Sequence, residues 1–146
     1  HALGISRRIE LQANKELGPL NKIDADMLDR IVNGHGDRIE AYSRMKEMGV
    51  RLIGGSDCGW GSYPFGDFQA ELISMSDFGL SPMEAILTGT WNAAQAIGKQ
   101  DSLGTIETKK EADFLLVEGN PVEDMECLRR VKAVVLGGRL VDSKQG

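Results

Sequence analysis

The sequence contains little cysteine, and its two cysteines are not arranged as a pair. Cys58 and Cys127 lie far apart in the chain and form no CxxC motif. A disulfide framework or a structural zinc site needs several cysteines at short, regular spacings. The pattern favours free thiols in a reducing compartment, so we expect the protein to be cytoplasmic.

Long hydrophobic runs and an excess of positive charge are also missing. No apolar segment approaches the roughly 20 residues of a membrane span, and the first residues do not resemble a signal peptide. The net charge is -5, and the basic clusters are the short pairs Arg7-Arg8, Lys109-Lys110 and Arg129-Arg130. Nucleic-acid binders usually present a basic face. We therefore expect no membrane partner and no nucleic-acid partner.

The composition is that of a globular domain. The chain has 146 residues, of which 41% are hydrophobic and 27% charged, and a domain of roughly 100–150 residues is ordinary. The chain begins with His1 rather than methionine. This start favours a chain cut out of a longer protein, although processing or tag removal would give the same result.

Helical patterns dominate the first part of the chain. Good helix formers fill residues 5–17 and predict a helix that ends at Gly18-Pro19. A helical stripe over residues 24–48 is interrupted at residues 33–36, and another helix is predicted over residues 67–78. Two more helices are therefore expected around this interruption, and a further one after them.

The strongest local signal is the segment Ser81-Pro82-Met83-Glu84. Serine at the N-cap, proline at the first helical position and glutamate three residues after the cap form a capping box. The signal predicts a helix to about Thr88. Thr90 is expected to cap a second short helix that runs through Ile97.

A short apolar run over residues 50–53 follows Gly49 and ends in Gly54-Gly55-Ser56-Asp57. A helix, a glycine, a buried strand and a polar loop make half of a parallel α/β repeat. In such folds the residues just past the carboxyl end of the strand form the ligand face. We expect Asp57 to lie there.

After Gly98 the pattern changes to short strands. We expect a strand and turn at residues 103–106, a buried strand at 112–117, a short helix at 125–130, and a hairpin of residues 131–136 and 139–141 about Gly137-Gly138. The interpretation places a boundary near residues 99–101. An α/β domain would occupy residues 1–99, and a small β domain residues 100–146.

Three segments in order resemble the amidohydrolase superfamily, particularly its imidazolonepropionase-like and prolidase-like members. GVRLIGGSD at residues 49–57 is similar to the passage that ends the eighth barrel strand of that family. GLSPMEAIL and TWNAAQAIG at residues 79–87 and 90–98 resemble its next helices. LGTIE and KEADFLLV at residues 103–117, closed by VKAVVLGGRLV at 131–141, resemble its return to a β-sandwich. Thr108-Lys109 departs from the usual Pro-Gly at a surface turn.

The resemblance implies the C-terminal part of a (β/α)8 TIM-type barrel, followed by strands of a companion β-sandwich. It implies hydrolysis of amide or cyclic amide C–N bonds in a small-molecule amide or dipeptide-like substrate. The cofactor would be a divalent metal, zinc being the candidate, which lowers the pKa of bound water. Asp57 would be both a metal ligand and the catalytic carboxylate that transfers the proton to the departing nitrogen.

Other candidate residues have two interpretations each. Trp60, Tyr63 and Phe65 would line the substrate pocket, or they would only pack on the barrel rim. Cys58 is expected to be an inert thiol because no base is near it in the sequence. His1 and His35 match no ligand motif of the family, so we expect no tightly bound metal in these 146 residues alone.

Two consequences follow for the chain as a whole. A barrel cut to one strand with its flanking helices exposes apolar edges, so we expect self-association or a homo-oligomer. A non-catalytic alternative also stays open, in which the chain is an accessory or interaction module that reuses the amidohydrolase C-terminal scaffold.

Overall fold

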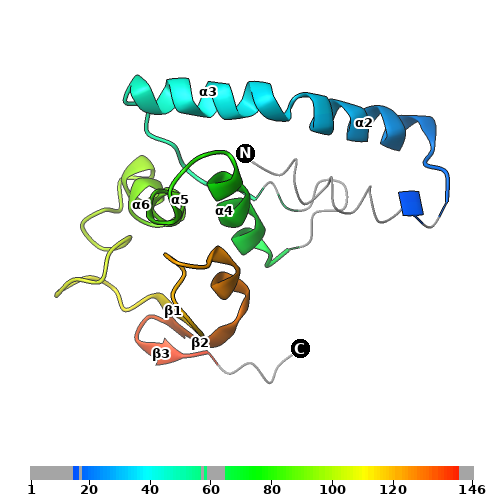
Figure 1. The fold of residues 1–146 in the computed structure, drawn as a ribbon. Coiled ribbons are helices and arrows are strands. Elements are labelled where there is room, and N and C mark those ends of the chain that lie inside the picture. Colours follow the sequence, from blue (N-terminus) through cyan, green and yellow to red (C-terminus); the bar gives the residue numbers. More distant parts are fainter. Residues whose placement is uncertain (1–14, 17, 57, 59–64, 142–146) are drawn as a thin grey trace. The chain divides into compact units, whose positions relative to one another are not determined.

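A computed structural model describes residues 15–16, 18–56, 58 and 65–141 of the chain. Its elements in chain order are α2 (Lys22–Asn33), α3 (His35–Glu47), α4 (Phe68–Asp77), α5 (Pro82–Gly89), α6 (Trp91–Ala96), β1 (Phe114–Val117), the 3-10 helix η1 (Met125–Arg129), β2 (Val131–Leu136) and β3 (Arg139–Leu140) (Figure 1). Among these described residues, no helix combines the length and the apolar character that crossing a bilayer requires.

The chain divides into two compact units. The first, called the helical unit below, comprises His1–Arg51 and Gly55–Leu80. The second, called the mixed unit, comprises Leu52–Gly54 and Ser81–Gly146. This division by contacts falls at a different place from the boundary expected near residues 99–101. That boundary refers to barrel and sandwich domains of a whole protein, and it stays a prediction.

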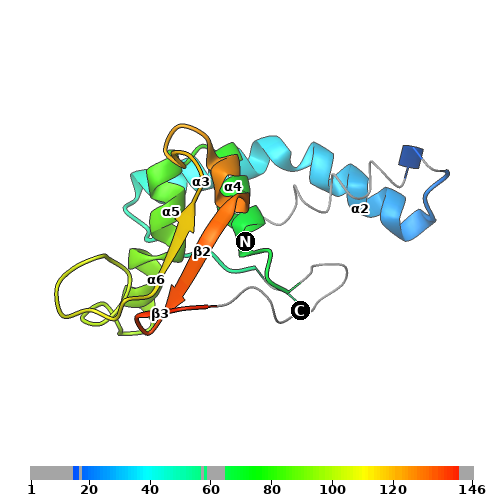
Figure 2. The same ribbon diagram turned by 90° about the horizontal axis from the view of Figure 1, so that it is seen from below.

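In the helical unit, the predicted interruption of the first long helical stripe is confirmed. Gly34 ends α2 and precedes α3, and the two helices follow one another nearly end to end (Figures 1 and 2). Asn21 caps α2 because its side-chain oxygen accepts from the Asp24 N–H at 2.9 Å. Leu28 and Ile31 are buried on one face of α2. The helix predicted over residues 5–17 lies outside the described residues, except for Lys15 and Glu16, which are helical.

Helix α4 confirms the helix predicted over residues 67–78 and supplies most of the core of the helical unit. Its buried apolar side chains include Leu72 and Met75. Phe78, which ends the helix, is 1% exposed. The Tyr42 ring of α3 stacks on Phe78 at a centroid distance of 5.3 Å, and the His35 ring packs against it at 5.2 Å. These contacts fix α3 against the end of α4.

The mixed unit begins with the predicted capping box. The Ser81 side chain accepts from the Glu84 N–H, while the Glu84 carboxylate accepts from the Ser81 N–H at 2.8 Å. The expectation for Thr90 is wrong in one respect. Thr90 occupies the N-cap position of α6 but makes no side-chain cap, because its hydroxyl donates instead to the Ile86 carbonyl of the preceding helix at 2.9 Å.

A three-stranded antiparallel sheet with the order β1-β2-β3 completes the mixed unit (Figure 2). The predicted hairpin is confirmed, and Gly137 and Gly138 form its turn with φ of 56° and 74°. Two positive φ values are what a two-residue type I′ turn requires. Strand β1 confirms the strand predicted at residues 112–117, but the expected burial is wrong. Leu115 and Leu116 are 42% and 56% exposed, because β1 is an edge strand of a very small sheet.

The strand predicted at residues 103–106 is wrong. These residues form turns, and the Leu103 N–H donates to the Lys99 carbonyl at 2.9 Å rather than to a neighbouring strand. Gly104 has φ +93°, and a Cβ built there would lie 2.8 Å from the Ala94 Cβ. This segment therefore lies close against α6 and makes no strand pairing.

The buried strand predicted at residues 50–53 is also wrong. The segment has no strand hydrogen bonding, and Val50 and Ile53 are 46% and 51% exposed. An extended segment becomes a strand only when a neighbour accepts and donates its backbone hydrogen bonds. In the described part of the chain the sheet consists of β1, β2 and β3, and none of them pairs with residues 50–53. The observed fold is therefore α/β with a small antiparallel sheet.

Candidate functional site

The predicted site centres on Asp57, and much of it lies outside the described residues. Asp57, Trp60 and Tyr63 fall there. Phe65 is described and is 80% exposed, and Cys58 is also exposed. The part of the site that the structure describes is therefore the backbone that leads to Asp57, residues 52–56.

Two hydrogen bonds hold this backbone to helices that follow much later in the chain. The Asn92 side-chain amide donates from Nδ2 to the Leu52 carbonyl at 2.9 Å. The Gly54 N–H donates to the Thr88 carbonyl at 3.1 Å. The Thr88 carbonyl is one of the last four of α5, which have no acceptor role inside an α-helix. The segment thus uses the free carbonyl end of α5 and the first turn of α6.

Local contacts build the support on which this segment lies. The capping box begins α5, and Thr88 near its end is 1% exposed and donates from its hydroxyl to the Ala85 carbonyl at 2.6 Å. Ala94 of α6 is buried. The Lys110 ammonium lies 4.9 Å from the centroid of the Trp91 ring, a cation–π geometry. These contacts fix both helices within the mixed unit.

Lys110 also joins a small polar group on the turn after α6. Its ammonium lies 3.6 Å from the Glu107 carboxylate, and the Thr105 hydroxyl donates to that carboxylate at 2.6 Å. The hydrogen bond from Thr105 is the main cause of a lowered pKa at Glu107, and the charge of Lys110 adds to it. The Glu107 side chain is exposed, so the group orders a turn and does not form an enclosed site.

Sequence reasoning assigns no role to Asn92, although it stands inside the TWNAAQAIG segment. One signal that could have found it is its amide side chain in the first turn of a short, alanine-rich helix. Asparagine side chains readily hydrogen-bond backbone groups. Only the fold shows that the backbone in question is Leu52.

A metal centre cannot be assembled from the described residues by themselves. No group of three or more His, Cys, Asp or Glu side chains within the described ranges is arranged to hold an ion. His35 packs its ring on Phe78. The donor set on these residues therefore does not fit a catalytic metal, which needs about three protein ligands.

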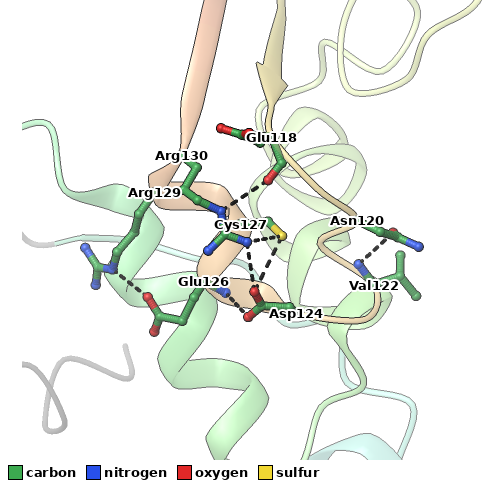
Figure 3. Close-up of polar contacts among 8 residues, drawn as sticks. All are labelled: Glu118, Asn120, Val122, Asp124, Glu126, Cys127, Arg129 and Arg130. Atoms are coloured by element: carbon green, nitrogen blue, oxygen red, sulfur yellow. Dashed lines mark hydrogen bonds and ion pairs between the residues drawn. The ribbon is translucent and has the colours of Figure 1, made fainter.

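A dense polar network lies elsewhere in the mixed unit, in the loop Glu118 to Arg130. The Arg130 guanidinium donates from Nη2 to Asp124 Oδ2 at 2.9 Å and to the Cys127 sulfur at 2.8 Å, and from Nε to the Glu118 carbonyl at 3.3 Å (Figure 3). The hydrogen bond from Arg130 lowers the pKa of Asp124, and the Glu126 N–H adds to this effect. Cys127 is 2% exposed, so the network closes a loop and offers no accessible thiol.

A buried carboxylate lies in the helical unit. Glu71 of α4 is buried and has partners. Burial is the main cause of a raised pKa at Tyr42, the negative charge of Glu71 raises it further, and Arg38 lowers it. These groups belong to α3 and α4, whereas a pocket of about 550 Å³ in the same unit lies beside α2.

Comparison with known proteins gives a consistent result. The family model described as "Amidohydrolase family" matches residues 7–141. Ochratoxinase of Aspergillus niger is 34% identical over 107 residues, which cover 70% of this chain and 22% of that protein. Imidazolonepropionase of Syntrophobacter fumaroxidans is 37% identical over 81 residues, which cover 52% of this chain and 18% of that protein.

Solved structures agree with these relatives. A Xaa-Pro dipeptidase crystallised with methionine in its active site superposes with a TM-score of 0.70 and 28% identity, covering 95% of this chain and 33% of that one. The chain therefore spans less than a quarter of the length of the two relatives above, and a third of this structure.

Proposed function

The chain belongs to the amidohydrolase family, and on this premise we propose that the intact protein hydrolyses C–N bonds in small-molecule amides or dipeptide-like substrates. The observation that carries the proposal is the match of the family model over residues 7–141. The names of the relatives fit it, since a Xaa-Pro dipeptidase acts on dipeptides. The resemblance of residues 49–57 to the end of the eighth barrel strand suggests that the reaction takes place next to Asp57.

The proposal assigns the chain to the C-terminal part of a TIM-type barrel, with its last strands in a companion β-sandwich. Exposed apolar side chains on β1, β2 and β3, among them Leu116, Leu136 and Leu140, support this assignment. A sandwich strand normally buries one face against a second sheet. The same exposed surface is the reason to propose self-association when the chain is separated from the rest of such a protein.

Within the proposal, Asp57 is the catalytic carboxylate. A carboxylate beside the scissile bond accepts a proton from the attacking water and delivers it to the departing nitrogen, which makes the amine a better leaving group. A divalent metal, with zinc as the candidate, is proposed as a cofactor of the intact protein. The described residues do not assemble its ligand set by themselves. The cytoplasm remains the proposed location.

The test is Asp57→Asn in the intact protein, assayed against a panel of dipeptides and N-acyl amino acids. The amide keeps the shape of the side chain but cannot accept the proton, so turnover should fall about 10²- to 10⁴-fold, the usual contribution of general acid–base catalysis. Circular dichroism should show unchanged folding. Near-normal turnover with unchanged metal content would contradict the role of Asp57.

A matched control is Asp113→Asn. Asp113 accepts from the Gly137 N–H at 2.6 Å across the sheet hairpin, and asparagine keeps an acceptor oxygen at the same place. This variant should therefore retain turnover. Equal losses in both variants would indicate a general sensitivity to asparagine and would not support a catalytic carboxylate.

A further inference from the structure

The three residues Leu52, Ile53 and Gly54 belong to a different compact unit from the residues on both sides of them. They group with Ser81–Gly146, whereas Arg51 and Gly55 group with the helical unit. Because the segment is too short to pack by itself, something in the mixed unit must hold it. The contacts that do so identify the residue on which the backbone before Asp57 depends.

The segment is fixed from two directions by residues of different helices. Asn92 donates to the Leu52 carbonyl at 2.9 Å, and the Gly54 N–H donates to the Thr88 carbonyl at 3.1 Å. The two bonds lie on either side of Ile53, so together they set both the position and the direction of the backbone. Only the first of them comes from a side chain, and it is partly buried.

We propose that Asn92 is a positioning residue for the catalytic chemistry, acting through its hydrogen bond to Leu52 on the backbone that leads to Asp57. This inference rests on the proposed function, in which Asp57 is catalytic and the backbone before it must be correctly placed. Asn92 touches no reacting atom in the proposal. It fixes where the chain enters the site, and displacement of a catalytic group by about 1 Å can reduce turnover about 10²-fold.

The chemistry of the contact restricts which side chains can make it. A carbonyl oxygen accepts and cannot donate, so its partner must carry an N–H or O–H at this reach. Asparagine in the first turn of α6 supplies that donor. Aspartate has the same shape but carries only acceptors when ionised, and its oxygen would face the Leu52 carbonyl oxygen. The difference between Asn and Asp at this position is therefore a difference in one hydrogen bond.

Asn92→Asp is the decisive variant because it separates positioning from stability. A carboxylate near a helix N-terminus is favourable for the helix, so α6 should persist while the bond to Leu52 is lost. In the intact protein we expect kcat to fall at least tenfold with KM changed less than threefold. Hydrogen exchange of the backbone amides in residues 52–55 should accelerate at least tenfold. Asn92→Ala should give the same pattern, and Asn92→Gln, which keeps a donor, should recover part of kcat.

Asn120→Asp is the matched control. The Asn120 side chain donates to the Glu123 carboxylate at 2.9 Å, in a loop of the same unit that makes no contact with Leu52 in the described hydrogen bonding. Loss of this amide donor should leave kcat and the exchange of residues 52–55 unchanged. Asn120→Asp therefore shows how much an asparagine-to-aspartate change away from Leu52 alters kcat and hydrogen exchange.

The outcomes are distinguishable. Normal kcat in Asn92→Asp and Asn92→Ala, with Asp57→Asn inactive, would overturn the role of Asn92 and leave the proposed function standing. Normal turnover of Asp57→Asn would overturn the proposed function and this inference with it. Global unfolding of both Asn92 variants would show a role in stability alone, and would also overturn the inference. A selective loss of kcat with faster exchange at residues 52–55 would support it.

Discussion

The segment Leu52–Gly54 and the loop from Glu118 to Arg130 lie in the same unit but are held in opposite ways. Leu52–Gly54 depends on Asn92 and Thr88, which follow it by more than thirty positions. The loop depends on itself: Glu118 and Arg130 close its ends, and the Glu118 N–H donates to the Arg130 carbonyl at 2.8 Å. Bringing the ends of a short loop together costs less chain entropy than bringing together residues that are far apart in the sequence. The contacts of Leu52–Gly54 therefore depend more on the folding of the whole unit.

The same contrast separates the two apolar runs from which strands are predicted. Residues 50–53 and 114–117 are both short and bounded by turn residues, and both are β-branched or apolar except at Arg51. Only the second pairs, with Phe114 opposite Val135 and Leu115 opposite Val134 in β2. Its partner follows directly after the loop Glu118 to Arg130, which its own contacts close. The first run lacks a neighbouring strand among the described residues, so an apolar pattern alone does not make a strand.

The largest effect on the local side of this comparison is expected for Gly119→Ala. Gly119 has φ +105°, and a Cβ there would lie 2.5 Å from the Cys127 sulfur. Strained backbone and overpacking against a buried side chain should together lower the free energy of unfolding by about 2–4 kcal/mol, as measured by urea denaturation. Hydrogen exchange at Gly54 should stay as slow as in the unchanged protein, because its support does not include this loop.

Two further variants divide this effect into its causes. Gly79→Ala has a similar φ of +93° but open space around its Cβ, so it should show the backbone cost alone. Adding Cys127→Ala to Gly119→Ala should relieve the clash and recover part of the loss. If Gly119→Ala and Gly79→Ala lower the free energy of unfolding equally, the contact with Cys127 does not contribute to the loss.

Apart from the cap expected at Thr90, whose hydroxyl bonds the nearby Ile86 carbonyl instead, what the sequence predicts follows the same division between local and distant contacts. The helix break at Gly34, the capping box at Ser81 and the turn at Gly137-Gly138 are all set by residues within a few positions, and all are confirmed. The strand at 50–53 and the burial of β1 depend on what lies beside them in space, and both predictions are wrong. The family is confirmed by the model match, whereas Asn92 needed the fold, since a spacing of forty residues has no sequence signature.

Ser81→Ala tests whether the distant support weakens together with α5. Loss of the capping box should lower the free energy of unfolding by about 1 kcal/mol and should accelerate exchange at Gly54, because its acceptor is the Thr88 carbonyl near the end of the same helix. Thr90→Ala is the comparison. Thr90 occupies an N-cap position without a capping bond, and the variant loses only the exposed hydroxyl bond to the Ile86 carbonyl, so it should cost about 0.5 kcal/mol, the low end for a hydrogen bond. Equal losses would mean that the capping box contributes nothing specific.

The smallest expected effect concerns acid, and it should be confined to the local loop. Arg130 holds the pKa of Asp124 below its ordinary value, so the folded state binds the Asp124 proton more weakly than the unfolded chain does. The resulting stability is present above the unfolded pKa of about 3.9 and disappears as the pH falls through the lower folded pKa. Asp124→Asn should therefore be less stable than the unchanged protein at pH 6, and the difference should shrink towards pH 2. The pair is exposed, so the effect should be modest and should weaken with salt.

Glu123→Gln, which alters a carboxylate bonded to Asn120 in the same loop, serves as the control in the same titration. A stability difference for Asp124→Asn that stays constant from pH 6 to pH 2 would show that the ion pair with Arg130 does not stabilise the loop.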